Sequence, residues 1–315
     1  MTNRRGIRCA FIGVAAALAF GASIAQAENG SDQGNVCVAT ALLQHRACEF
    51  GVTEDAKIGR AVCKNLSDRA AASACIEEVI QTRNEGNERC DGQFEARDDV
   101  CDALPKGPYD PKIDAAKFVD EITNPFAPFT PGSHWVYESS GQAEVERIVI
   151  DVLETTREIL GVACTTVSDK VYVDGVLIED TLDYLAQDVA GNVWYFGELS
   201  QSFEDGLIAG IEGSFIAGIN GAKPGFWMKA APVAGETYRQ EWALGEAEDV
   251  ATIVTLNADV EAPFENGQPI LKVREFTPIS PGAVEFKYFV PGVGFVLEEN
   301  PASGERLELI EYTPG

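Results

Sequence analysis

The segment 63-CKNLSDRAAASAC-75 lies at the centre of a symmetric set of cysteines. Moving outward from Arg69, cysteines occur at equal distances on the two sides and form three candidate pairs: Cys63 and Cys75, Cys48 and Cys90, Cys37 and Cys101. Within each arm the steps between cysteines are 11 and 15 residues. At about 100° per residue, those steps rotate by only about 20° and 60° around a helix. The spacing therefore predicts an antiparallel helical hairpin over residues 32–104, closed by these three disulfides.

Local signals add detail to this hairpin. Thr53 and Ser67 are candidate N-caps, Gly51 and Gly86 are weak points in the helices, and residues 66–68 are the expected turn. A zinc site is the alternative use of the cysteines. Structural zinc sites usually take cysteine pairs two to four residues apart, and the chain contains no such pair. Disulfides are therefore the better interpretation.

The first 27 residues have the pattern of a secretory signal peptide. Three arginines precede the apolar run CAFIGVAAALAF, and Ala25-Gln26-Ala27 matches an A-x-A cleavage signal. The apolar run is too short to span a bilayer as a mature helix. We therefore expect export to the periplasm or outside the cell, where disulfides persist, and no membrane insertion after cleavage.

The chain carries a net charge of −26. Such a surface repels phosphate backbones and anionic lipids, so nucleic acid and membrane surfaces are not expected partners. It attracts cations, basic peptides or calcium. The alternative is that the charge serves solubility alone.

The remaining chain divides in two. Residues 105–132 are rich in proline and are expected to form a linker. Residues 133–315 contain many short β-rich runs separated by turn signals, such as Asp174-Gly175 between 170-KVYV-173 and 176-VLI-178. The predicted fold class is therefore α+β, with the stapled hairpin followed by a large antiparallel β domain, either a barrel or a strongly curved sheet.

A short repeat interrupts the β-rich part. Residues 207–213, LIAGIEG, recur as 215–221, FIAGING. One interpretation is a glycine-rich strand pair packed closely in the core. The other is a mobile flap over a pocket, closed by Pro224, Phe226 and Trp227.

Two stretches resemble a known group. Residues 124–138, NPFAPFTPGSHWVYE, and 288–296, YFVPGVGFV, resemble the opening NPFxPxxPGxxWVYE and closing PGVGxV motifs of a family of exported bacterial proteins of unknown function. Residues 184–188 and 191–198 also fit that group. The resemblance implies the β fold and export, and it implies no activity or catalytic residues.

The sequence gives weak signals for catalysis. The chain has no G-x-S-x-G, H-E-x-x-H or P-loop motif. Its histidines are His45 and His134. Cys164 is an odd thiol that is either a buried small side chain, or a reactive group or partner in an intermolecular bridge. Candidate carboxylate pairs are Asp183 with Asp188, and Glu198 with Glu204 or Asp205. Catalytic residues therefore stay unassigned.

Two sets of residues are candidates for binding. The tryptophans are ligand-binding candidates if the barrel encloses an apolar ligand, and core residues otherwise: Trp135, Trp194, Trp227 and Trp242. The candidate oxygen ligands for calcium are Asp188, Glu246, Glu248 and Asp249. Their spacing does not match an EF-hand. No cofactor is expected other than calcium.

Together these observations favour a non-catalytic envelope module that binds a small ligand or an envelope protein, with the hairpin as a spacer or docking arm. One alternative is a carboxylate-based hydrolase acting on envelope or extracellular polymer, and another is a calcium-binding structural protein. A pocket with converging carboxylates of perturbed ionisation would favour the hydrolase. A dry pocket lined by tryptophan would favour the binder.

Overall fold

The computed structural model describes residues 35–140 and 144–315. The predicted signal peptide, residues 1–27, lies outside the described residues. Within the described ranges, no helix is long and apolar enough to cross a membrane.

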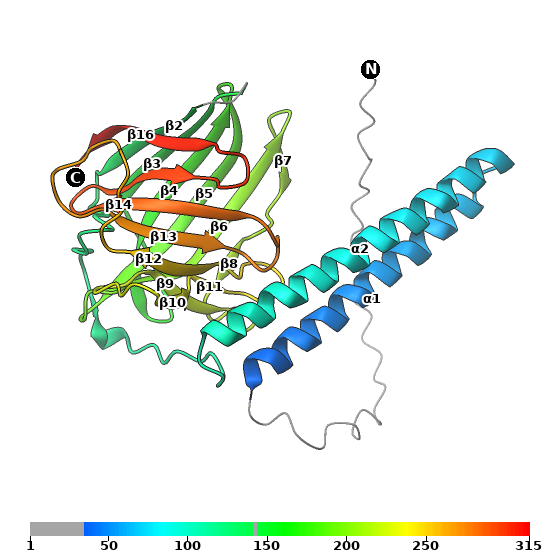
Figure 1. The fold of residues 1–315 in the computed structure, drawn as a ribbon, viewed down its shortest axis with the longest axis horizontal. Helices are drawn as coiled ribbons and strands as arrows, with labels where there is room; N and C mark the ends of the chain where they lie inside the picture. Colours follow the sequence, from blue (N-terminus) through cyan, green and yellow to red (C-terminus); the bar gives the residue numbers. More distant parts are fainter. Residues whose placement is uncertain (1–34, 141–143) are drawn as a thin grey trace.

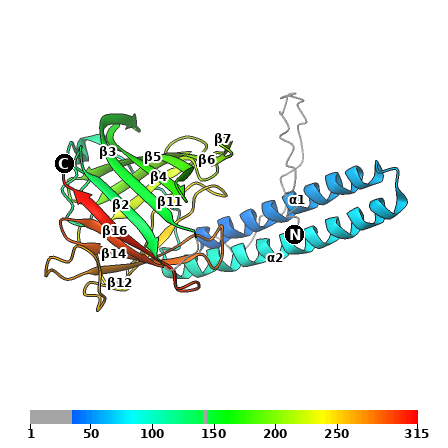
Figure 2. The same ribbon diagram turned by 90° about the horizontal axis from the view of Figure 1, so that it is seen from above.

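Two long helices form the predicted hairpin. Helix α1 (Val36–Lys64) and helix α2 (Arg69–Ala103) run antiparallel and project from the barrel (Figure 1 and Figure 2). The disulfides join Cys37 to Cys101, Cys48 to Cys90 and Cys63 to Cys75, with Cα separations of 5.5, 5.7 and 5.5 Å. The predicted connectivity is confirmed.

The helix ends differ in part from the prediction. The N-cap of α2 is Asp68 rather than Ser67, and its carboxylate accepts a hydrogen bond from the amide of Ala71. Helix α1 continues through Gly51 and Thr53 without a break. Helix α2 likewise continues through Gly86. A Cβ at this position would come within 2.9 Å of Val52 Cγ2 on the opposite helix. That glycine permits close packing of the helices.

The rest of the chain forms a nearly closed, barrel-shaped antiparallel sheet, which confirms the predicted fold class. Along the sheet the order is β10-β12-β13-β14-β15-β16-β2-β3-β4-β5-β6-β9-β11, and β10 also contacts β9. The strands are β2 (His134–Ser140), β3 (Glu146–Ile159), β4 (Val162–Val173), β5 (Val176–Asp188), β6 (Val193–Glu204), β9 (Lys223–Met228), β10 (Thr237–Arg239), β11 (Glu241–Trp242), β12 (Val250–Thr255), β13 (Leu271–Phe276), β14 (Val284–Val290), β15 (Gly294–Glu299) and β16 (Arg306–Thr313).

The proline-rich segment 105–132 joins the hairpin to the barrel and packs on the barrel. It contains a short 3-10 helix, η1 (Ala115–Lys117), and strand β1 (Phe118–Val119), which pairs with β5. Its apolar side chains Ile122 and Phe129 are buried in the main core. This segment therefore contributes to the barrel interior.

The glycine-rich repeat forms two short strands that pair with different parts of β6. Strand β7 (Leu207–Gly210) and strand β8 (Phe215–Ile216) each pair with β6 and not with each other. Gly197 on β6 has φ +142°, and a Cβ there would lie 2.3 Å from the carbonyl oxygen of Phe215. The two halves of the repeat are therefore strands of one sheet, and glycine is needed at position 197, where β8 pairs closely with β6.

Cys164 belongs to a second, smaller apolar cluster with Ile159, Tyr184 and Phe196. It is fully buried and unpaired among the described cysteines. Burial raises the pKa of its thiol to about 12. The thiol therefore behaves as a small apolar side chain, as the first of the two interpretations predicts.

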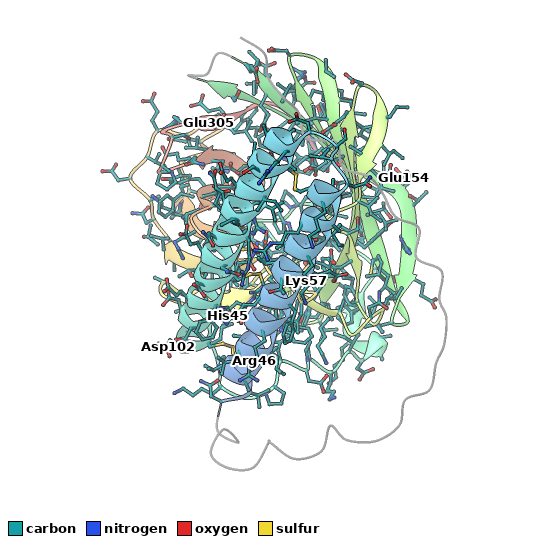
Figure 3. All side chains as sticks on the ribbon, turned by 90° about the vertical axis from the view of Figure 1, so that its right-hand side faces the viewer. His45, Arg46, Lys57, Asp102, Glu154 and Glu305 are labelled. Atoms are coloured by element: carbon teal, nitrogen blue, oxygen red, sulfur yellow. A yellow bond between two sulfur atoms is a disulfide. The ribbon has the colours of Figure 1, made fainter. Side chains whose placement is uncertain are left out.

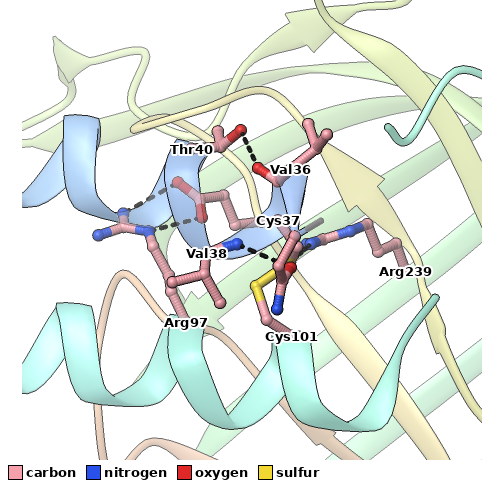
Figure 4. The surroundings of a disulfide bond; sticks show 9 residues. Val36, Cys37, Val38, Thr40, Arg97, Cys101 and Arg239 are labelled. Atoms are coloured by element: carbon pink, nitrogen blue, oxygen red, sulfur yellow. Dashed lines mark hydrogen bonds and ion pairs between the residues drawn. A yellow bond between two sulfur atoms is a disulfide. The ribbon is translucent and has the colours of Figure 1, made fainter. Parts of the chain in front are cut away.

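The hairpin is fixed to the barrel at its base. Arg97 of α2 forms a bidentate ion pair with Glu248, with both nitrogen-oxygen distances at 2.9 Å. Both side chains are almost completely buried. Gln93 donates a hydrogen bond to the carbonyl oxygen of Ile279. A guanidinium nitrogen of Arg239, on the barrel, lies 3.5 Å from the sulfur of Cys37, which is disulfide-bonded to Cys101 (Figure 4). Figure 3 shows the hairpin in front of the barrel.

Candidate functional site: an acidic cavity in the barrel

Residues of the barrel line a cavity of about 450 Å³ that is partly open to solvent. Alternate side chains of a β-strand point to opposite faces of the sheet, so every second residue of a barrel strand faces inward. Part of the lining is apolar and includes Phe129, Leu185, Trp227, Phe289 and Phe295. The rest of the lining is polar and strongly acidic.

Eight carboxyl side chains line this cavity, and Lys287 is the single lysine or arginine in its lining. The carboxyls come from three places in the fold: Asp169, Asp183 and Glu198 on β4, β5 and β6; Glu241, Glu246 and Asp249 on and after β11; Glu275 and Glu298 on β13 and β15. Because so few positive groups balance them, the cavity carries a strong negative potential whenever these carboxyls are ionised.

Asp183 and Glu198 are held together by one tyrosine. They are directly opposite on β5 and β6, and the hydroxyl of Tyr195 lies 2.5 Å from Asp183 Oδ1 and 3.1 Å from Glu198 Oε2. Burial raises the pKa of Asp183 to about 6 and that of Glu198 to about 8. A hydroxyl has one proton to donate, so a protonated Glu198 completes the chain by donating to Tyr195 while Tyr195 donates to ionised Asp183.

Lys287 lies close to two other carboxyls of the cavity. Its ammonium lies 2.7 Å from Glu275 and 3.8 Å from Glu298. Burial would lower the pKa of Lys287, but the surrounding carboxylates outweigh this effect and hold that pKa well above its usual value. The pKa of Glu298 is raised to about 7 by burial, and Lys287 opposes that shift. Lys287 therefore stays charged at neutral pH, whereas Glu298 is partly protonated there.

Two further carboxyls lack strong partners. Asp169 Oδ1 is buried without a hydrogen-bond partner, and burial raises the pKa of this residue well above its usual value. Glu241 is only 7% exposed, and its pKa is likewise raised by burial. A buried carboxylate with few partners is unfavourable, so burial favours the protonated form of both groups.

The four tryptophans proposed as ligand-binding residues do not line one cavity. Trp135 is 2% exposed in the core, where its ring stacks on Tyr312. Trp194 packs between Phe118 and Phe226 and donates to Asp188. Trp227 lines the acidic cavity, whereas Trp242 lines a second cavity beside the hairpin.

The four proposed calcium ligands are also dispersed. Asp188 accepts hydrogen bonds from Asn192 and Trp194 within its own turn, and Glu248 is paired with Arg97. Glu246 and Asp249 do line the acidic cavity. Among the described residues, no three histidine, cysteine or acidic side chains are grouped so that they could hold a metal ion.

The other candidates for catalysis have local roles. His134 pairs with Asp151 at 2.7 Å, and His45 pairs with Asp91 at 2.8 Å. Asp183 faces Glu198 and not Asp188, its proposed partner. The signal that could have found this pair is the hairpin turn at residues 189–191, because folding β5 onto β6 there brings Asp183 and Glu198 opposite each other.

Two solved structures show a likeness to this chain. A predicted exported protein with a YmcC-like fold from Bacteroides fragilis is 11% identical, with a TM-score of 0.31, covering 58% of this chain and 96% of that chain. A predicted lipoprotein from Parabacteroides distasonis is 12% identical, with a TM-score of 0.29, covering 60% of this chain and 98% of that chain. No protein-family model and no curated protein matches the chain. Likenesses this low assign no function.

Proposed function

We propose that this chain is an exported envelope protein, periplasmic or secreted, whose barrel binds a small organic cation with an apolar part. The observation that supports this best is the composition of the cavity, in which eight carboxyls and one lysine adjoin a wall of aromatic and aliphatic side chains. An ammonium or guanidinium group would pair with the carboxylates, and an apolar chain would contact Trp227 and Phe289. Membership in the exported family whose motifs the chain resembles is part of the same proposal.

Proton release links this binding to pH. Asp183, Glu298 and Glu198 have pKa values raised to about 6, 7 and 8, so the cavity gains negative charge as the pH rises over that range. A bound cation stabilises the ionised carboxylates and releases their protons. Affinity for a cation should therefore increase from pH 5 to pH 8.

The test compares two probes of equal chain length, octylammonium and octanol. Calorimetric titration should show octylammonium binding more tightly than octanol, and more tightly at pH 8 than at pH 5. Glu198→Gln should weaken octylammonium binding and reduce its pH dependence. Glu154→Gln removes an exposed carboxylate on β3 (Figure 3) and should leave both unchanged. Equal affinity for octylammonium and octanol would refute the proposal.

A hydrolase is the second candidate, and the shared tyrosine favours it. Two carboxyls with pKa values near 6 and 8, bridged by Tyr195, form the kind of acid and base pair that glycoside hydrolysis uses. Glu198 would be the acid and Asp183 the base or nucleophile. Release of reducing ends from bacterial envelope polysaccharide, lost in both Glu198→Gln and Asp183→Asn, would replace the binding proposal with this one.

A further inference from the structure

A second cavity, of about 640 Å³, lies where the base of the hairpin meets the barrel. Its walls come from the ends of α1 and α2, from the segment after α2, and from β9, β10 and β11. We name it the junction cavity. Its lining holds four lysine and arginine side chains and three acidic ones, a balance opposite to that of the barrel cavity and of the whole chain.

Three of these four cations have a carboxylate partner. The pairs are Arg97 with Glu248 at 2.9 Å, Lys229 with Glu236 at 3.4 Å, and Lys223 with Asp110. Arg239 is the fourth. Within the described residues no carboxylate forms an ion pair with Arg239, whose guanidinium reaches only the Cys37 sulfur, at 3.5 Å, and lies 5.8 Å from the ring of Tyr109. Arg239 is therefore the one cation of this lining without an ion-pair partner among the described residues.

The surroundings of Arg239 make this lack of a partner unfavourable. Arginine has five N–H donors and keeps its charge in proteins, so a partly buried guanidinium needs acceptors. The sulfur of a disulfide is a weak acceptor, and burial lowers the pKa of Arg239 below its ordinary value. The carboxylate of Glu248 opposes this shift, and it is already held by Arg97.

Two other polar groups in the lining also lack partners. The hydroxyl of Tyr238 is buried with no hydrogen bond, and the whole residue is only 4% exposed. The side-chain oxygen of Gln44 on α1 is buried and unpaired as well. Buried polar groups are nearly always hydrogen-bonded in native proteins, so these two unpaired groups are a second feature of the lining that favours a polar ligand.

Aromatic rings form the apolar part of the lining. Trp242 and Phe226 face the cavity, and the ammonium of Lys229 lies 3.7 Å from the centre of the Phe226 ring. Lys223 lies 5.8 Å from the centre of Trp242. These flat apolar surfaces bordered by cations suit a molecule with a hydrophobic body and an anionic end.

We propose that the junction cavity binds a small organic carboxylate with an apolar or aromatic body, whose carboxylate pairs with Arg239. The body would lie against Trp242 and Phe226, and a polar substituent would reach Tyr238 or Gln44. The site is separate from the barrel cavity and does not depend on its proposed function. It is built by both parts of the chain, so a bound carboxylate would also hold the hairpin against the barrel.

The experiment measures octanoate and octanol binding to the full chain by calorimetry. We expect octanoate to bind at least about 10-fold more tightly than octanol at this site, because an ion pair with arginine adds to the apolar contact. Arg239→Met should weaken octanoate binding by about 10-fold to 100-fold and leave octanol binding unchanged. Arg46→Met removes an exposed arginine on α1 (Figure 3) and should change neither.

A second variant, Arg239→Lys, keeps a positive charge in the cavity. It tests the proposal even if the Arg239→Met protein does not fold. It loses the planar fork of donors, so octanoate affinity should lie between those of the native chain and Arg239→Met. Glu198→Gln should leave octanoate binding unchanged, which separates this site from the barrel cavity. Absence of octanoate binding at millimolar concentration, equal affinity for octanol, or binding unaffected by either Arg239 variant would each refute the proposal.

Discussion

The hairpin and the barrel differ in how much side chain they bury. The two helices, of 29 and 35 residues, bury nine residues between them, and three of these nine are disulfide cysteines. The barrel gathers 28 buried residues in its main core cluster. A core of the second kind stabilises a domain by removing apolar surface from water, and the first is too thin to do so. The hairpin therefore depends on covalent links where the barrel depends on packing.

Reducing the disulfides should affect the two regions very differently. Each bridge contributes about 2–4 kcal/mol, and the hairpin has little else to replace them. With a reductant present, the helical circular dichroism signal should fall while the tryptophan emission of the barrel persists, since all four tryptophans lie on barrel strands. Cys164→Ala should respond in the same way as the native chain. Simultaneous loss of both signals would show that the barrel also needs the bridges.

Separating the two regions at their contact should be the next largest effect. Arg97→Met leaves Glu248 as an unpaired buried carboxylate, so the free energy of unfolding measured in urea should fall by about 3–5 kcal/mol. The double variant Arg97→Met with Glu248→Met should recover part of that loss. Arg147→Met, which breaks a partly exposed pair with Glu138, is the control and should cost less than about 1 kcal/mol. Equal losses would mean that the buried contact adds nothing specific.

Adding a methyl group at two glycines compares the packing of the two regions directly. On β9, Gly225→Ala places a Cβ 2.3 Å from the backbone oxygen of Gln240, which should destabilise the barrel by about 1–3 kcal/mol. In the hairpin, Gly86→Ala meets only the side chain of Val52, and alanine favours a helix by about 1 kcal/mol over glycine. Urea unfolding followed by circular dichroism should show little net change for Gly86→Ala. A larger loss there would mean that the hairpin packs as rigidly as the barrel.

The last comparison is a pH dependence confined to the barrel. A carboxyl whose pKa is raised on folding holds its proton more tightly when folded, so it stabilises the protein at low pH and loses this contribution as the pH rises through the folded value. With raised values of about 6 for Asp183 and 8 for Glu198, the urea midpoint of the barrel should decrease between about pH 4 and pH 8. Glu198→Gln should flatten the upper part of this decrease, and Glu154→Gln should not. A midpoint constant from pH 5 to pH 8 would contradict the assignment.

The hairpin was predictable in detail because its constraints are local and covalent. The equal spacing of cysteines around Arg69 specifies one connectivity, and helical geometry places each set on one seam. The local signals at Gly51 and Thr53 were misleading. Neither a glycine nor a candidate N-cap ended α1, which continues between its disulfide-bonded cysteines. For the barrel, strand positions and the turn at Asp174-Gly175 were predictable, and the strand order was not.

The cavity could not be predicted from residue types alone. Acidic residues are common along the chain, so only the strand register shows that Asp183 and Glu198 share Tyr195. Glu248 illustrates the opposite error. Its oxygen atoms make it a candidate calcium ligand by residue type, but its actual partner, Arg97, is 151 residues away in sequence. Long-range pairs of this kind depend on how the hairpin docks, and no local pattern specifies that docking.

The attachment of the hairpin at its base has a hydrodynamic consequence. The contacts described with the barrel come from Cys37, Gln93 and Arg97, so the far part of a helix about 43 Å long extends into solvent (Figure 2). An elongated particle experiences more friction than a compact one of equal mass. The monomer should therefore elute early from a sizing column and sediment slowly, as a larger globular assembly or a loosely folded chain would. Light scattering, which reports mass independently of shape, is the measurement by which its stoichiometry should be judged.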